Sequence, residues 1–161
     1  GRNANLLEDA FKFAKMGGTI DLTCGESESK FHSVADAVKK AKKEGVPMEK
    51  VTMSSDGQGS WSNYDAEGKL VEIGVSDVDT IYRQIVYMVK EENMDFEELL
   101  ALGTKNPAMA LELYPKKGAV KEESDADILI MNEDLSLDTV IAMGVPMMRD
   151  GKILKKGTYE K

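Results

Sequence analysis

Apolar side chains recur along the first ninety residues at two alternating spacings. The helical spacing of three to four residues appears in residues 5–16, 34–44 and 77–92 and predicts three amphipathic helices. Between them, residues 19–23 and 51–55 are short runs rich in β-branched side chains, which predict strands. The order helix, strand, helix, strand, helix is typical of βα units built around a parallel sheet. The pattern therefore predicts an α/β fold.

Local signals define where the predicted elements begin and end. Ser33 is suited to cap the second helix, with Asp36 three residues later, and Gly45 ends it. Residues 57–76 are expected to form a loop of about twenty residues, a length common in lids and binding loops. Two further helices are predicted at 95–102, capped by Asp95, and at 107–113, where Pro107 is expected in the first helical position.

The character of the chain changes after Tyr114-Pro115. Residues 128–131, 139–142 and 147–154 are short β-prone runs, and the last is expected to be a hairpin around an Asp-Gly turn. We therefore divide the chain into an α/β domain of residues 1–115 and a small β domain of residues 116–161.

Composition restricts the partners. Among 161 residues, 29 acidic side chains outnumber 21 basic ones and give a formal charge of −8. Such a chain repels the phosphates of nucleic acid. No apolar run approaches the roughly 18 residues needed to cross a bilayer, and the first residues lack the apolar segment of a signal peptide. No nucleic acid, no membrane and a cytoplasmic location are the expectations.

Cys24 and His32 are each the only residue of their kind. One cysteine excludes an intrachain disulfide and a thiolate metal cluster built from this chain alone. Cys24 is expected to be a buried strand-end thiol, because no basic residue adjoins it. His32 is expected to have a surface or capping role. A single histidine with scattered acids cannot form a closed transition-metal site.

The candidate for chemistry is Asp56, which ends the run Val-Thr-Met-Ser-Ser at 51–55. An aspartate before Gly57-Gln58-Gly59 can be an ordinary turn residue. It can also be a site residue, because the carboxyl ends of parallel strands face the active site in α/β folds. The residues themselves leave both interpretations open.

Four further residues could contribute to the same site. Ser60 offers a hydroxyl close to Asp56, although no serine lies in a Gly-x-Ser-x-Gly frame. Trp61 and Tyr64 could line a substrate pocket or simply pack on the scaffold. Arg2 could bind a carboxylate with its guanidinium, or be an ordinary solvated terminal residue.

Several stretches resemble the isoaspartyl dipeptidases of the amidohydrolase superfamily. They are Gly17-Gly18-Thr19-Ile20-Asp21-Leu22-Thr23, the run Val51 to Ser60 containing Ser-Ser-Asp-Gly-x-Gly-Ser, Glu67-Gly68-Lys69-Leu70 and Ile73-Gly74-Val75. Nearer the end, Asn106-Pro107-Ala108, Ala126-Asp127-Ile128-Leu129-Ile130 and Asp150-Gly151-Lys152 are similar to the C-terminal signature of the superfamily. The resemblance covers nearly the whole chain.

The resemblance implies a fold and an activity. It implies the last two βα units of a (β/α)₈ TIM barrel, with strands 19–23 and 51–55 as the seventh and eighth, followed by part of a small β-sandwich domain. The implied activity is zinc-dependent hydrolysis of β-aspartyl dipeptides by a hydroxide shared between two zinc ions. Asp56 would be both zinc ligand and proton carrier, while Ser60 and Arg2 would hold the dipeptide. The complete enzyme would be a homo-oligomer.

The departures from the family matter equally. The His-x-His motif after the first strand, the metal-bridging lysine and the histidines after strands five and six are absent, and a complete barrel takes roughly 250 residues. The chain, which starts at Gly1, is therefore expected to be a C-terminal fragment that is inactive alone. The alternatives are another amidohydrolase, acting on N-acyl amino acids or cyclic amides, and a non-catalytic association module.

Overall fold

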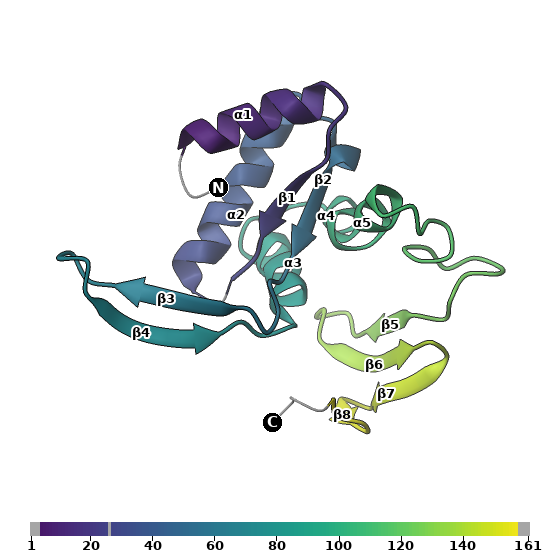
Figure 1. Ribbon diagram of the computed structural model, residues 1–161. Coiled ribbons are helices and arrows are strands. Elements are labelled where there is room, and N and C mark those ends of the chain that lie inside the picture. Colours follow the sequence, from purple (N-terminus) through teal and green to yellow (C-terminus); the bar gives the residue numbers. More distant parts are fainter. Residues whose placement is uncertain (1–3, 26, 158–161) are drawn as a thin grey trace.

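The computed structural model describes residues 4–25 and 27–157, and its elements follow the predicted alternation (Figure 1). The first part contains α1 (Ala4–Lys15), β1 (Ile20–Thr23), α2 (Glu28–Lys43), a 3₁₀ turn η1 (Met48–Lys50) and β2 (Val51–Ser54). It continues with β3 (Ser60–Tyr64), β4 (Leu70–Val75), α3 (Thr80–Lys90), α4 (Phe96–Gly103) and α5 (Lys105–Ala110). The second part contains β5 (Ile128–Met131), β6 (Leu137–Ala142), β7 (Val145–Arg149) and β8 (Lys152–Ile153).

The two strands β1 and β2 pair in parallel, as the alternating pattern predicts. Ile20 lies opposite Val51 and Leu22 lies opposite Met53, and all four side chains are buried. They pack with residues of α1, α2, α3 and α4 in one core, in which Phe11, Val38, Met88 and Leu99 are almost fully buried. The helices therefore cover one face of the strand pair, and the residues that alternate with the core positions lie on the other face.

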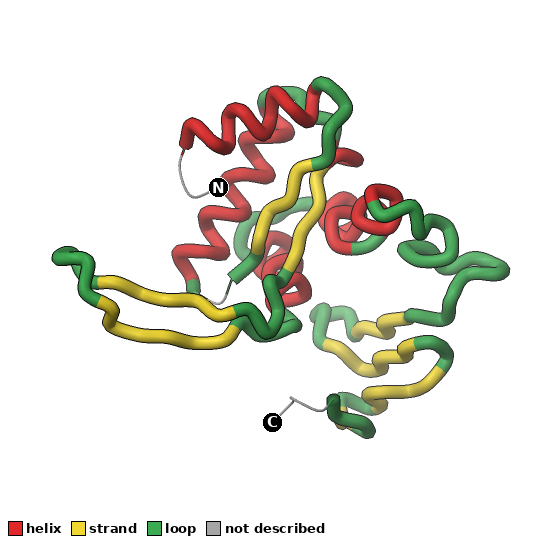
Figure 2. The backbone as a smooth tube through the Cα atoms, in the orientation of Figure 1, coloured by secondary structure: helices red, strands yellow, loops and turns green. Residues whose placement is uncertain are grey.

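The prediction of a loop at 57–76 was wrong, because most of this segment forms the antiparallel hairpin of β3 and β4 (Figure 2). Its turn is closed by the Asp65 carboxylate, which accepts hydrogen bonds from the amides of Glu67 and Lys69 at 3.1 and 2.8 Å. The hairpin extends away from the helices (Figure 1). The alternation of apolar residues in 70–75 is typical of a strand, and the prediction of a loop did not take it into account.

Three predicted helix starts were also wrong, and one of them is that of α3, which begins at Thr80 and not at residue 77. The second helix begins at Glu28 and its cap is Ser27, whose hydroxyl accepts the Lys30 amide, so Ser33 lies inside the helix. The added turn is favoured because Phe31 stacks on Tyr87 of α3, with ring centroids 5.5 Å apart. The last helix begins at Lys105 instead of Pro107.

The end of the chain forms one antiparallel sheet in the order β5-β6-β7-β8, with Arg149 opposite Lys152 across the predicted Asp-Gly turn. A second layer of a sandwich is not present among residues 4–25 and 27–157. The sheet is attached to the helices by the Tyr82 hydroxyl, which donates to the Leu135 carbonyl at 2.9 Å. The long connection between Ala110 and Ile128 contains the predicted boundary at residue 115, and the division into two domains stays a prediction.

Candidate functional site

Asp56 lies just beyond the carboxyl end of β2, in the tight loop that leads to the β3–β4 hairpin. Its side chain is exposed, and its backbone adopts a left-handed conformation with φ of 50°. Non-glycine residues visit this region uncommonly, although aspartate tolerates it better than most. The loop holds this conformation through the Gly59 amide, which donates to the Asp56 carbonyl at 2.9 Å.

Gly59 determines where the Asp56 carboxylate can lie. A Cβ atom at Gly59 would lie 2.7 Å from Asp56 Oδ1 and 2.8 Å from the Asp56 carbonyl oxygen. The carboxylate therefore rests against the backbone of Gly59, in space that only glycine leaves open. The loop is also joined to the hairpin base by the Gln58 amide, which donates to the Ser76 carbonyl at 2.8 Å.

The structure brings Ser60 next to this loop, as predicted. Ser60 is exposed, and it begins β3 opposite Val75 of β4. Trp61 packs over Gly74 of its own hairpin, and Tyr64 is exposed further along β3. Arg2 lies outside the described residues.

A cluster of three polar residues on the same side of the strand pair was not recognised from the sequence. The Asp21 carboxylate of β1 accepts hydrogen bonds from the hydroxyls of Thr52 and Ser54 of β2, at 2.8 and 2.5 Å. The signal was present in the alternation of Ile20-Asp21-Leu22-Thr23, which places Asp21 on the face away from the apolar core.

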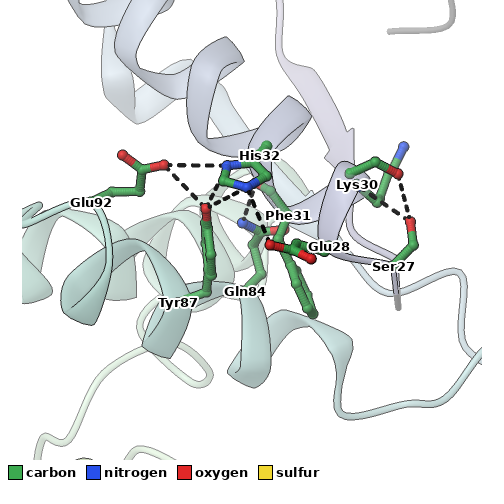
Figure 3. Close-up of polar contacts among 9 residues, drawn as sticks. Ser27, Glu28, Lys30, Phe31, His32, Gln84, Tyr87 and Glu92 are labelled. Carbon is green, nitrogen blue, oxygen red and sulfur yellow. Dashed lines mark hydrogen bonds and ion pairs between the residues drawn. The ribbon is translucent and has the colours of Figure 1, made fainter.

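His32 belongs to a surface network between α2 and α3 (Figure 3). Its Nδ1 lies 2.6 Å from the Tyr87 hydroxyl oxygen, and the Tyr87 hydroxyl donates to Glu92 at 3.2 Å. Lys39 forms an ion pair with Glu92 and lowers the pKa of that carboxyl, while partial burial and the Glu92 carboxylate raise the pKa of Tyr87. At neutral pH Tyr87 is therefore neutral and Glu92 charged. The surface role expected for His32 is confirmed.

Cys24 is a buried thiol at the end of β1, as expected, and only 3% of it is exposed. Its amide donates to the Ser54 carbonyl at 2.8 Å and so extends the parallel pairing beyond Thr23. Burial, with a contribution from the Asp21 carboxylate, raises the pKa of the thiol to about 12. Cys24 is therefore an unreactive part of the core.

A metal centre requires more ligands than the described residues bring together. The Asp56 carboxylate is a suitable oxygen ligand for zinc. Across residues 4–25 and 27–157, however, no group of three or more His, Cys, Asp or Glu side chains is placed to hold a metal ion. These residues alone do not fit a zinc site, and Asp56 could supply one ligand to a larger one.

A cavity of about 660 Å³ lies between α4, α5 and β5, and apolar residues such as Leu100, Leu111 and Ile128 line it. Neither Asp56 nor Ser60 contacts it. In the described part of the chain, no helix is both long and apolar enough to cross a membrane.

Comparison with solved structures shows close likeness over nearly the full chain. The β-aspartyl dipeptidase of the thermophilic, keratin-degrading Fervidobacterium islandicum AW-1, solved in complex with the β-Asp-Leu dipeptide, is 34% identical with a TM-score of 0.83. A second structure of that organism's β-aspartyl dipeptidase is 32% identical with a TM-score of 0.76. Each match covers 99% of this chain, but only 41% and 38% of the two dipeptidase chains.

A more distant likeness concerns the fold alone. The N-acetylglucosamine-6-phosphate deacetylase of Pasteurella multocida is 15% identical, with a TM-score of 0.59 over 81% of this chain and 37% of its own.

The sequence model of the amidohydrolase family matches residues 4–154. Since that match spans nearly the entire chain, and the two dipeptidases agree with it in both sequence and fold, the chain belongs to the amidohydrolase family.

Proposed function

We propose that this chain is the C-terminal part of a β-aspartyl dipeptidase, and that it supplies Asp56, Ser60 and Arg2 to the active site. The observation that carries the proposal is the TM-score of 0.83 and 34% identity to a β-aspartyl dipeptidase solved with β-Asp-Leu. That protein is more than twice as long as the matched region, because the match covers 41% of it.

The open strand pair supports a larger barrel. β1 and β2 form a two-stranded parallel sheet among the described residues, with one face covered by helices. Parallel sheets occur almost only where both faces are covered, as in TIM barrels. We place β1 and β2 as the last two strands of a (β/α)₈ barrel, so that Asp21, Thr52 and Ser54 line its interior and Asp56 lies at its catalytic end.

Asp56 would accept and donate protons during hydrolysis. Hydrolysis adds water across the β-aspartyl amide: the attacking water loses a proton, the C–N bond breaks and the departing amine gains a proton. A carboxylate at the end of a rigid strand can accept the first proton and deliver the second. Asp56 would be a ligand of one of two zinc ions, with the other ligands coming from outside this chain, and the two ions would supply Lewis-acid chemistry.

Ser60 and Arg2 would orient the substrate. Ser60 directly follows the Asp56 loop in the chain and is exposed, and its hydroxyl can hydrogen-bond to a bound dipeptide. The Arg2 guanidinium can bind the dipeptide's α-carboxylate in a bidentate manner. Fixing that carboxylate would place the scissile amide near Asp56, and such positioning lowers the activation barrier.

The test compares the 161-residue chain with the complete protein. We expect the chain alone to leave β-Asp-Leu intact with or without zinc. The complete protein should cleave β-Asp-Leu and spare α-Asp-Leu, and D56N should lower its kcat by roughly 10²–10⁴-fold, the usual contribution of a positioned acid-base group. D36N is the matched control, because Asp36 is exposed on α2.

Three results would contradict parts of the proposal. Cleavage by the 161-residue chain would show that it is not an inactive fragment. A D56N variant with full activity would remove Asp56 from the chemistry. Cleavage of N-acyl amino acids or cyclic amides in preference to β-Asp-Leu would favour a different amidohydrolase.

A non-catalytic association module is the second candidate. The exposed apolar side chains Leu6, Phe13 and Met16 on or just after α1 favour it, because such surfaces promote association. Homo-oligomerisation of the complete enzyme is proposed on the same basis. Upstream coding sequence with a His-x-His strand would leave the module interpretation without support.

A further inference from the structure

The Asp21 carboxylate joins the two parallel strands on the face turned away from the helical core. Oδ1 accepts from the Thr52 hydroxyl at 2.8 Å, and Oδ2 accepts from the Ser54 hydroxyl at 2.5 Å. Thr52 lies directly opposite Asp21 in the parallel register, and Ser54 is the next residue of β2 on the same face. The two oxygens of one carboxylate therefore contact two different residues of β2, which are neighbours on the same face of the strand.

Both the backbone and the side chain of Ser54 form hydrogen bonds. Its carbonyl accepts from the Cys24 amide at 2.8 Å, and its hydroxyl donates to Asp21. Both contacts come from β1 or its immediate continuation. Ser54 is the last residue of β2 and precedes Asp56 by two residues, so these contacts are the final attachment of the strand before the Asp56 loop.

Beyond Ser54 the attachment to the sheet is weaker. The Ser55 carbonyl accepts a long hydrogen bond of 3.4 Å from the Thr80 hydroxyl. The Gly57 amide bonds to the Ser55 hydroxyl, and the Gln58 amide bonds to Ser76 of the hairpin base. These contacts shape the loop and tie it to itself, to the projecting hairpin and, through the long bond to Thr80, to the start of α3. The position of Asp56 relative to the strands therefore depends strongly on Ser54.

We propose that Asp21 is a positioning residue for Asp56, acting through the hydroxyls of Thr52 and Ser54 to hold the end of β2 in place. The proposal rests on the proposed function, in which Asp56 carries protons during amide hydrolysis. The role of Asp21 is exerted through Thr52 and Ser54, since each of its two oxygens accepts from one of their hydroxyls. In a closed barrel the Asp21 carboxylate would be removed from water, and the hydroxyls of Thr52 and Ser54 would then stabilise its negative charge.

The kinetic test uses the complete protein and β-Asp-Leu. D21N retains the side-chain shape but replaces one acceptor oxygen with a donor, and S54A removes one hydroxyl. We expect each to lower kcat about 10- to 100-fold with KM changed less than about 3-fold, because misplacement of about 1 Å can cost that much in rate. S54T keeps the hydroxyl and should therefore have a kcat close to that of wild type. D36N should behave as wild type.

A double-mutant cycle tests whether the two groups act together. D21N/S54A should lower kcat little more than either single change, since both remove the same contact. Full additivity would mean that Asp21 and Ser54 act separately and would overturn the proposal. An unchanged kcat in D21N would overturn it equally, as would an effect of D21N on KM alone.

A second readout does not depend on activity. Amide hydrogen exchange should accelerate at residues 55–59 in D21N and S54A, while exchange within α2 stays at the wild-type rate. Equal acceleration in both segments would indicate general destabilisation and contradict a positioning role. If the complete protein fails to cleave β-aspartyl dipeptides, the proposed function fails, whereas the exchange result still decides whether Asp21 positions the loop.

Discussion

At the residue scale, the placement of the Asp56 carboxylate depends on the glycine three residues later. A Cβ at Gly59 would meet the Asp56 carbonyl oxygen at 2.8 Å, and a Cβ at Gly118 would meet the Thr104 carbonyl oxygen at the same distance. Both substitutions force backbone atoms apart. They do so in different places, because Gly118 lies in the connection between α5 and β5.

We expect Gly59→Ala to displace Asp56 and to lower the kcat of the complete protein about 100-fold, the scale of a misplaced catalytic group. Gly118→Ala should lower the melting temperature without a comparable loss of kcat. The measurement is steady-state hydrolysis of β-Asp-Leu alongside thermal unfolding. Equal kcat for Gly59→Ala and wild type would show that the proposed role of this loop is wrong.

Cys24 provides a pH-dependent prediction. Its raised pKa of about 12, against an ordinary value of 9.0, leaves roughly a thousandfold less thiolate at pH 8. Alkylation by iodoacetamide should therefore be slower in the folded chain than in urea by at least that factor. Because the pKa is raised on folding, the associated stability is complete below pH 9 and declines as the pH rises toward 12. Rapid alkylation of the folded chain would show that the thiol is accessible.

At the scale of elements, helix starts are defined by individual side chains. Asp95 caps α4 as predicted, and its carboxylate accepts the Glu98 amide at 2.9 Å. By contrast, Asp79 before α3 makes no such side-chain hydrogen bond and instead pairs with Arg83 at 2.9 Å. The same residue type at two helix starts therefore has two different roles.

Asp95→Ala should lower the free energy of unfolding by about 1 kcal/mol, the typical loss when an N-cap is removed. Asp95→Asn should lose less, because an amide oxygen can still accept the Glu98 amide. Urea titration followed by circular dichroism measures both. Identical losses in the two variants would mean that charge, and not the hydrogen bond, stabilises this helix start.

At the scale of the whole molecule, a small ion-pair network attaches the C-terminal sheet. Lys117 in the connection pairs with Asp125 at 3.0 Å and with Asp127, whose other oxygen accepts the Met143 amide at 2.7 Å. Lys117 and the Met143 amide together hold the pKa of Asp127 below its ordinary value. The network therefore joins the connection to the turn between β6 and β7.

The attachment should weaken in acid. A carboxyl whose pKa is lowered on folding adds stability above its ordinary pKa of 3.8, and this stability is lost as the pH falls through the lower folded value. Thermal unfolding should therefore show a steeper acid decline in wild type than in Asp127→Asn. The difference will be modest, because Asp127 is partly exposed. Parallel pH profiles would contradict the inference.

Several features could be predicted from local sequence. The β-branched runs at 19–23 and 51–55 and the helical spacing around them are sufficient for the two strands and their parallel pairing. Asp95 as a cap and Asp150-Gly151 as a hairpin turn followed from short-range chemistry. The position of Asp56 after β2 was predicted in the same way.

Other features depended on contacts between distant residues. Local sequence predicted Ser33 as the cap of α2, whereas contact between Phe31 and Tyr87, 56 positions apart in numbering, favours the earlier cap at Ser27. The contacts of Asp21 with Thr52 and Ser54 join residues 31 and 33 positions apart. Sequence pattern by itself determined the two parallel strands, the presence of the helices around them and the end of the strand where Asp56 lies, because those depend on local spacing. Only the tertiary structure decided what holds that strand end in place, because hydrogen bonds across β1 and β2 exist only once the strands are paired.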